Sequence, residues 1–506
     1  MDWWYANWRT LLETIGVVLA ALIGAAGAVI AAVIGVRKKR GKHIDKKIKP
    51  KHYNHNYRLA EAQEEQLYYQ RALDFYLHSS EDYSEDLDNT DRAAAFVSAG
   101  RMCFQLARYD EAVGFFVQAQ AIYNATPKAN QVNLAVIYNN LAVVYRYQGD
   151  YDKALIWHDK ALTIEEKKLK KKNLYTTTTY NQIAIVYTLQ GKYEDALKLV
   201  FKALAIRERK LGKDHPSTAM VYNNIGGIYK CQGKFDETLF FFNRALTVQE
   251  KKLGKDHPDT ATTYNQIASV FLAQGKYDDA LDYHFKALAI REKKLGMDHP
   301  DVATAYSGIG IAYRLQGKCD DALDYHLKAL TIREKKLDMD HPDIALSYNN
   351  IGQAYGEQGK SDEALEYYFK ALAIIEKKLG INHPDAATVY SNIGMACRLQ
   401  SKYDDALVYH FRAMAIREKI LGKDHPDTAA SYNNIAFIYG RQKKYAEAIS
   451  YFSRALCVLL DTFSPEHPNA KACLGNLRTA YELLPHKTPF DKWLKQQLDK
   501  QSTTPP

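Results

Sequence analysis

The 506-residue chain contains few of the residues that interrupt regular structure or cross-link small domains. It has 14 prolines, which argues against long proline-rich linkers. Its six cysteines are scattered, and no two of them form a CxxC pair. That pattern argues against a disulfide framework or a cysteine-rich zinc site, and it is typical of reduced thiols in a reducing compartment.

Sequence signatures of catalysis are also missing. The chain has no glycine-rich phosphate loop, no HExxH motif and no nucleophile elbow. Its net charge of +9 is concentrated between Arg37 and Lys51, where nine basic residues stand against one Asp. The remainder is nearly neutral, so it lacks the basic face of a nucleic-acid-binding domain. We expect neither an enzyme nor a nucleic-acid-binding protein, and we expect no cofactor or metal.

One long apolar run lies near the N-terminus. The 23 residues from Thr14 to Val36 carry no charge, and a helix of that length spans the roughly 30 Å core of a bilayer. The basic segment from Arg37 to Lys51 follows it, so the positive-inside rule predicts a single-pass anchor with the N-terminus outside and the rest cytoplasmic. A cleaved signal peptide would show the opposite charge order and a shorter run. Small residues at every fourth position are compatible with a homo-oligomer formed through this helix.

The rest of the chain repeats with a period of 42 residues. A Tyr-Asn string or a close relative of it returns at Tyr138, Tyr180, Tyr222, Tyr264, Tyr306, Tyr348, Tyr390 and Tyr432. A degenerate copy begins near Phe96, and a half copy extends to Leu484. Each unit has the pattern of two helices, with small residues where the helices meet. A fixed period of this length predicts a solenoid.

The unit resembles a tetratricopeptide repeat of the kinesin light chain type. The resemblance is carried by the small residue, the Tyr three positions later, Gly-Lys-Tyr, Lys-Ala-Leu and the linking string LGKDHPDTA. It implies an all-α fold, a right-handed superhelical solenoid of antiparallel helix pairs, here preceded by one transmembrane helix. Kinesin light chains carry a heptad coiled coil for the heavy chain. This chain has an apolar anchor instead, so it is not expected to be a motor subunit.

The Asp-His pair in LGKDHPDTATTYN, from Leu253 to Asn265, raises the question of a metal or proton-transfer site. Metal ligands must converge on one ion, whereas equivalent residues of stacked units are separated by at least the 8–10 Å between helix axes. A structural role accounts for each residue: Gly ends one helix, Asp or His caps the next, and Pro occupies its first turn. We therefore predict helix capping at these junctions. His158, His284, His326 and His410 alternate with aromatic residues in other units, which predicts packing.

A polar row on the first helices predicts the binding surface. If the small residue of each first helix is numbered 8, positions 5, 9 and 12 share a face that differs from the apolar face. Kinesin light chains bind cargo peptides through such asparagines and basic residues, and Asn and Arg suit an extended, acidic partner. The alternative is an exposed helix face that Asn merely solvates. The predicted groove residues are Asn139, Arg146, Asn181, Asn223, Lys230, Asn265, Arg314, Asn349, Arg398 and Asn433.

The expected organisation has six segments: a short extracytoplasmic N-terminus (1–13), the transmembrane helix (14–36), a basic juxtamembrane segment (37–56), a degenerate acidic region (57–95), about nine repeats plus a half repeat (96–484), and a C-terminal cap and tail (485–506). The predicted function is a non-enzymatic scaffold that holds partner proteins or peptides at the cytoplasmic face of a membrane. The alternatives are a self-assembling structural membrane protein and a regulatory subunit of an enzyme complex.

Overall fold

The structure is a computed structural model, and it describes residues 69–70, 72–74, 76, 89–125, 127–169, 173–463, 465–485 and 488–502. All regular elements among these residues are α-helices. Two helices make one unit. The even-numbered helices, which come first in each unit, are α4 Asn89–Gln105, α6 Pro127–Tyr147, α8 Leu174–Leu189, α10 Pro216–Cys231, α12 Pro258–Ala273, α14 Pro300–Leu315, α16 Pro342–Glu357, α18 Pro384–Leu399, α20 Pro426–Arg441 and α22 Pro468–Glu482.

The odd-numbered helices come second in each unit. They are α5 Tyr109–Ala125, α7 Tyr151–Leu169, α9 Tyr193–Leu211, α11 Phe235–Leu253, α13 Tyr277–Leu295, α15 Cys319–Lys336, α17 Ser361–Lys378, α19 Tyr403–Ile420 and α21 Tyr445–Thr462. Helix α23, Phe490–Ser502, follows the last half unit. Each even-numbered helix packs against the odd-numbered helix after it, and that odd-numbered helix packs against the even-numbered helix of the next unit. These contacts confirm the predicted array of helix pairs.

The junctions between units are built as the sequence predicted. At one of them Gly254 adopts a φ of 96° after the end of α11, a conformation that L residues rarely adopt. The ring nitrogen Nδ1 of His257 then accepts the backbone N–H of Asp259 at 3.1 Å, and Pro258 lies in the first turn of α12. The same histidine cap begins seven helices, at His215, His257, His299, His341, His383, His425 and His467. The capping prediction is confirmed, with His rather than Asp as the capping residue.

The two helices of one unit approach closely where the sequence places a small residue. A Cβ atom on Gly226 in α10 would lie 2.5 Å from the ring of Phe242 in α11. Gly310 and His326 form the equivalent contact between α14 and α15, with 2.6 Å for the same measure. The absence of a side chain on the first helix therefore makes room for a ring from the second.

Polar contacts join neighbouring units at their surface. The Gln at the C-terminal end of an even-numbered helix donates to an acid at the start of the preceding odd-numbered helix, as Gln316 does to Asp278 at 2.7 Å. The repeated tyrosine hydroxyl donates to a glutamate 14 residues earlier, as Tyr264 does to Glu250 at 2.6 Å. Both contacts recur along the array and keep consecutive units in one register.

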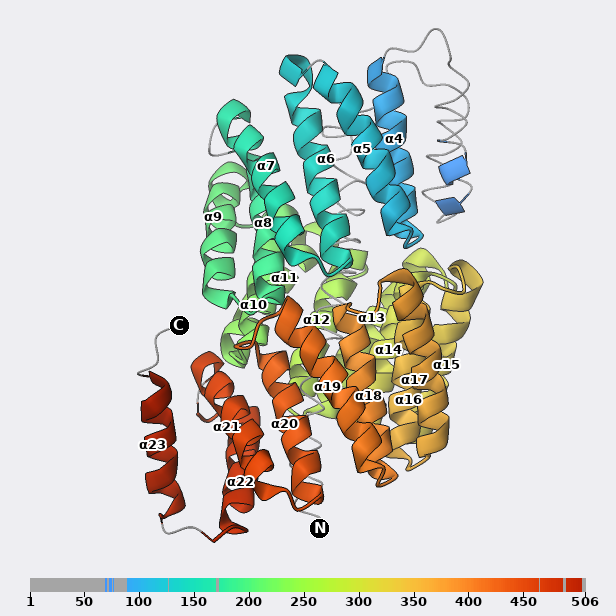
Figure 1. The fold of residues 1–506 in the computed structure, drawn as a ribbon. Coiled ribbons are helices and arrows are strands. Elements are labelled where there is room, and N and C mark those ends of the chain that lie inside the picture. The colour runs from blue at the N-terminus through green and yellow to red at the C-terminus, as the bar shows by residue number, and fades with distance from the viewer. Residues whose placement is uncertain are drawn as a thin grey trace.

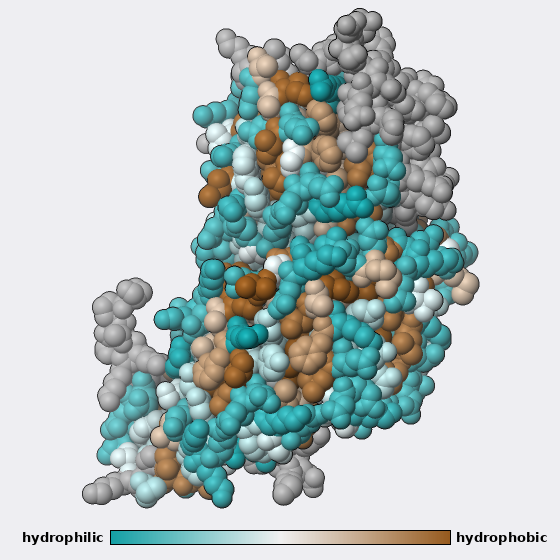
Figure 2. All heavy atoms as spheres, turned by 45° about the vertical axis from the view of Figure 1, so that its right-hand side comes forward, coloured by the Kyte–Doolittle hydropathy of each residue, from teal (hydrophilic) through white to brown (hydrophobic). Residues whose placement is uncertain are grey.

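The units wind into a coil in which the last units lie beside the first. Figure 1 shows α18 to α20, coloured orange, next to α6 to α8, coloured teal and green. Figure 2 shows one face of this coil, with short apolar patches set between hydrophilic side chains. At the C-terminal end Phe490 is 7% exposed and packs with Tyr481, so α23 closes the last core cluster.

The predicted membrane anchor, Thr14 to Val36, lies outside the described residues. Among the helices that the structure does describe, none combines the length and apolarity needed to cross a bilayer.

Candidate protein-binding surface

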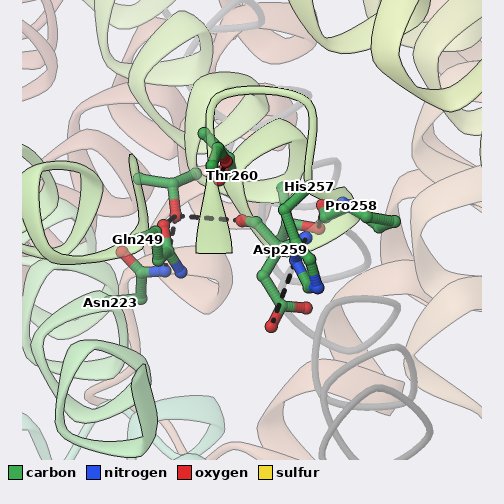
Figure 3. A network of polar contacts seen from close by, with 9 residues as sticks. Asn223, Gln249, His257, Pro258, Asp259 and Thr260 are labelled. Atoms are coloured by element: carbon green, nitrogen blue, oxygen red, sulfur yellow. Dashed lines mark hydrogen bonds and ion pairs between the residues drawn. The ribbon is translucent and has the colours of Figure 1, made fainter. Parts of the chain in front are cut away.

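The predicted row of asparagines lies between consecutive even-numbered helices. Asn223 in α10 donates to the hydroxyl of Thr263 in α12 at 2.7 Å. Thr263 in turn donates to Gln249 of α11, also at 2.7 Å. Figure 3 shows Asn223 and Gln249 turned toward each other, beside the junction that carries His257. Asn223 is therefore part of a polar link between units and is not freely solvated.

Asn139 shows the fullest version of this link. Its amide donates to Thr179 at 2.9 Å and to Glu165 at 3.3 Å, and its oxygen meets Nδ1 of His158 at 2.8 Å. Burial raises the pKa of the Glu165 carboxyl to about 7, although the hydrogen bonds from Thr179 and Asn139 oppose that shift. A carboxyl at this position therefore exchanges its proton near neutral pH.

Most of the predicted asparagines are buried by the winding of the units. Asn181 and Asn223 are each 8% exposed, Asn349 is 7% exposed and Asn433 is 1% exposed, whereas Asn139 and Asn265 are half-buried. Asn349 accepts a hydrogen bond from Asn392 of the next unit at 2.8 Å. Within the described residues, neither the nitrogen nor the oxygen of the Asn433 amide has a hydrogen-bond partner. A buried amide without partners can still donate hydrogen bonds to a ligand and accept them from it.

The predicted basic residues are also buried, with different partners. Arg314 is 5% exposed and pairs with Glu357 of the next unit. Arg146 is 6% exposed and lies 4.5 Å over the ring of Tyr147. Arg398 is half-buried over Phe437 at 5.1 Å.

Lys230 differs from the other basic residues in its surroundings. It is 6% exposed, and its ammonium group donates to the Ser269 hydroxyl at 3.0 Å. Burial lowers the pKa of Lys230 to about 8. The hydrogen bond to a neutral hydroxyl leaves its charge without the neutralisation that Glu357 gives Arg314.

The sequence analysis missed a second buried basic row, which lies on the odd-numbered helices. Arg333 is 3% exposed and donates to the Ser347 hydroxyl at 2.6 Å. Arg207, Arg291 and Arg417 occupy the same position in other units and are 8%, 6% and 4% exposed. The signal for this row was the recurrence of Arg in the strings AIRE and TIRE at a fixed place, 15 residues before the repeated tyrosine of the next unit. An Arg at this position could lie on the surface in water or be buried and hydrogen-bond to the next unit. The sequence is the same in both cases, so only the packing distinguishes them.

The histidines of the odd-numbered helices are buried, as predicted. His158, His284, His326 and His410 are between 0% and 5% exposed. Burial lowers the pKa of each of them to about 3. They are neutral at physiological pH, where they fill space in the core, and Nδ1 of His158 and of His284 lies within hydrogen-bond distance of an Asn side chain.

The junction residues do not assemble into a metal site. Among the described residues, no group of three or more His, Cys, Asp or Glu side chains has the arrangement needed to hold an ion. The junction Asp256 instead accepts a hydrogen bond from Lys293 of the following odd-numbered helix at 2.6 Å. This acid therefore links the end of a unit to the junction that precedes it.

Comparison with known structures gives several matches of low sequence identity. The nearly identical TPR-like repeats of a Podosopora anserina protein assigned to the kinesin light chains match at 24% identity and a TM-score of 0.35, over 40% of this chain and 96% of that one. BtubC (BKLC) from P. vanneervenii matches at 22% identity and a TM-score of 0.37, over 44% and 88%. The Cut9-Hcn1 hetero-tetramer of the APC/C matches at 17% identity and a TM-score of 0.39, over 84% and 83%. A comparison with curated proteins gives no match.

The family pattern described as the tetratricopeptide repeat matches the chain nine times in overlapping windows. The matched residues are 91–167, 133–209, 175–251, 219–293, 259–335, 301–377, 343–419, 385–461 and 427–484. Together these windows cover more than half of the chain, and they coincide with the helix pairs described above. The chain belongs to the tetratricopeptide repeat family.

Proposed function

We propose that this protein is a non-enzymatic scaffold that binds extended, acidic segments of partner proteins along its even-numbered helices. Tetratricopeptide repeat domains typically hold protein partners, and the described residues show no metal-binding cluster that would favour catalysis instead. The right-handed superhelix expected for this repeat type would present the even-numbered helices on its concave side. The predicted asparagines and basic residues would then form the contact surface.

The observation that carries the proposal is the buried charge of Lys230 together with the amide of Asn433, which has no hydrogen-bond partner among the described residues. A buried ammonium beside a hydroxyl is costly, because it has lost its hydration without gaining an opposite charge. A carboxylate from a partner would supply that charge, and a peptide backbone would supply both a donor and an acceptor for the Asn433 amide. Both side chains stand at positions that the sequence pattern selected for binding.

We further propose that the scaffold acts at the cytoplasmic face of a membrane. The support is the uncharged run from Thr14 to Val36 and the basic segment after it. Protease protection of an N-terminal tag in sealed vesicles tests this topology. In vesicles whose cytoplasmic face points outward, we expect added protease to digest the repeats and to spare the tag. Digestion of the tag, or release of the chain by alkaline carbonate, would contradict this topology.

The binding proposal is tested by selecting a displayed library of random dodecapeptides on the full-length chain in detergent micelles. We expect the selected peptides to be rich in Asp and Glu. Lys230→Gln should then weaken their binding about tenfold, the order of magnitude of one charge-assisted hydrogen bond. The matched control is Lys255→Gln, which removes the same charge from an exposed junction. If no peptides are enriched, or if both variants bind equally, the proposed surface is wrong.

A further inference from the structure

Two parts of the array that are far apart in sequence lie against each other. His383, which caps α18, approaches the carbonyl oxygen of Tyr147 at the end of α6, with a distance of 2.9 Å from Nε2 across 236 residues. Arg108 pairs with Asp338 at 3.4 Å across 230 residues. These separations equal about five and a half units of 42 residues. The coil therefore completes a turn after that length, and its second turn rests on its first, as Figure 1 shows.

The contact repeats in register from unit to unit. The first turn contributes the hairpin loop, which is the loop between the two helices of one unit. The second turn contributes the capping histidine of a junction between units. A Cβ atom added to the loop glycine would lie 2.8 or 2.9 Å from the opposing histidine or its neighbouring proline. The contacting pairs are Gly149 with the junction of His383 and Pro384, Gly191 with His425, and Gly233 with His467.

Each contacting histidine serves two helices at once. Nδ1 of His383 accepts the backbone N–H of Asp385 at 3.1 Å, so the proton of the neutral ring lies on Nε2. That Nε2–H then donates to the Tyr147 carbonyl, which is one of the unsatisfied carbonyls at the end of α6. His425 repeats this arrangement, with Nδ1 on the N–H of Asp427 and a hydrogen bond to the backbone of Leu189. We call these contacts between the two turns the histidine clasp.

Burial of the junction histidines follows the turn and not the local sequence. The side chains of His257 and His299, on the first turn, are 33% and 20% exposed. Those of His341, His383 and His425, on the second turn, are 12%, 8% and 7% exposed. All five rings make the same cap to their own helix. The additional burial in the last three therefore comes from the neighbouring turn.

The clasp lies directly over the proposed binding residues. Arg146 is in the last turn of α6, and its carbonyl accepts the N–H of Gly149 at 3.1 Å. Lys230 has the same relation to Gly233 at the end of α10, with a distance of 2.9 Å. The second turn thus covers the ends of the helices that carry these two basic residues. Separation of the turns would therefore free the ends of the two helices beside Arg146 and Lys230.

Separation of the turns leaves each unit intact. In a repeat array the units are held by their nearest neighbours, whereas the clasp joins units more than five apart. Releasing it exposes the hairpin loops and the apolar contacts between the turns, which include Ile420 and Leu421 beside Tyr151 and Leu379 beside the first core cluster, while every helix pair keeps its own core. Opening of this kind costs much less than unfolding.

We propose that the histidine clasp opens and closes reversibly and thereby controls access to the binding residues of the even-numbered helices. This regulatory role rests on the proposed function, but the opening itself can be measured without a partner. An acidic segment that binds the open coil would hold the turns apart, because it interacts with the open state more strongly than with the closed one.

The test places lysine at the loop glycines, because Lys443 already occupies the same loop position with a φ of 61°. The double variant Gly191→Lys and Gly233→Lys inserts a side chain where His425 and His467 lie. The matched control is Gly275→Lys and Gly359→Lys, which has the same charge change and loop conformation, with no atom within 4 Å of an added Cβ. Both are made in the full-length chain in detergent.

The readout is acetylation of Lys230 by an amine-reactive ester, followed by mass spectrometry. We expect acetylation several-fold faster in the Gly191 and Gly233 variant than in wild type, and an unchanged rate in the control. Equal rates in the two double variants would overturn the proposal. The acidic peptides selected above should also associate faster with the clasp variant. If no peptide binds wild type or either variant while Lys230 acetylation is still faster in the clasp variant, opening of the clasp is supported and the proposed function is wrong.

A second variant covers the case in which the lysine substitutions prevent folding. Gly191→Cys with His425→Cys joins the turns by a disulfide, since the Cβ built at Gly191 lies 2.9 Å from the His425 ring. Oxidation should slow Lys230 acetylation, and reduction should restore it. Equal rates in the oxidised and reduced forms would show that the native coil does not open by this route.

Discussion

Several buried positions hold a histidine in one unit and an aromatic residue in another. His326 in α15 packs into the space left by Gly310, as Phe242 in α11 packs into the space left by Gly226. His326 is 1% exposed, and neither of its ring nitrogens has a hydrogen-bond partner among the described residues. The imidazole therefore adds an unsatisfied polar group where Phe would add none.

We expect His326→Phe to stabilise the array, and to do so more strongly in acid. Burial lowers the pKa of His326 to about 3, below the 6.5 of the unfolded chain, so wild type loses stability as the pH falls below 6.5. The gain from the substitution should grow by about 2 kcal/mol between pH 7.5 and pH 5. Urea unfolding at both pH values measures it. The same change at the more exposed His257 is the control, and an equal pH slope for wild type and His326→Phe would contradict the prediction.

Glu165 offers a test with the opposite sign. Its carboxyl is buried and has its pKa raised to about 7 from 4.5, so the native state holds a proton that the unfolded state releases, and stability falls as the pH rises from 4.5 to 7. Gln249 occupies the equivalent position and accepts from Thr263 in the same way. Glu165→Gln should therefore stabilise the chain at pH 8 by at least about 1 kcal/mol, with little effect at pH 4.5. A gain that is the same at both pH values would argue that the carboxyl is not the cause.

At the scale of the helix, two adjacent glycines of α10 have opposite roles. Gly226 faces Phe242, and a Cβ there would lie 2.5 Å from the ring, whereas a Cβ on Gly227 would have no atom within 4 Å. Both residues are in the helix interior, where Gly is less favourable than Ala by about 1 kcal/mol. The pair therefore separates the contribution of helix propensity from that of packing.

We expect Gly226→Ala to destabilise the chain by about 1–3 kcal/mol, the usual cost of overpacking a core. Gly227→Ala should stabilise it by up to about 1 kcal/mol, because it improves helix propensity without a clash. Chemical unfolding of the two variants measures the difference directly. A stabilising Gly226→Ala would mean that α10 and α11 are not packed as closely as the structure shows.

At the scale of the whole molecule, the clasp makes the array differ from a simple row of units. In a row, loosening the C-terminal end affects the last units alone. Here the junction before α22 also touches the first turn, through His467 and Gly233. Loosening of the C-terminal end can therefore also affect the hairpin loop at Gly233, which is far from it in sequence.

We expect Trp493→Ala to raise hydrogen exchange both in α22 and in the hairpin loop at Gly233. Trp493 packs against Tyr481 with ring centroids 4.5 Å apart, so its loss should weaken α22 and, through His467, the hairpin loop at Gly233. Exchange at the hairpin loop of Gly275, which no second-turn residue approaches within 4 Å of an added Cβ, should stay the same. If exchange rises at α22 while the Gly233 loop is unaffected, the two turns are not coupled.

The periodicity of the sequence was sufficient to predict the helix pairs. The small residues at Gly226 and Ala268 match a ring or an apolar side chain on the second helix, and capping by His257 depends on residues within three positions of it. Such interactions are local, so the same residues produce the same geometry in each unit. The row of asparagines was also visible, because it lies on one face of a helix. Its polar links to the next unit were not, because they depend on how the units are rotated against one another.

The sequence by itself thus determined the unit: two helices, their caps, their close approach and the family. The tertiary structure decided how deeply the same residue is buried in different units. His257 and His425 stand in nearly the same string, LGKDHPDTA, yet one is 33% exposed and the other 7% exposed. The reason is physical: each unit adds a small rotation, and only the sum over more than five units brings one turn onto another. No window of sequence contains that sum, so the clasp and the additional burial of His383 and His425 appear only in the folded coil.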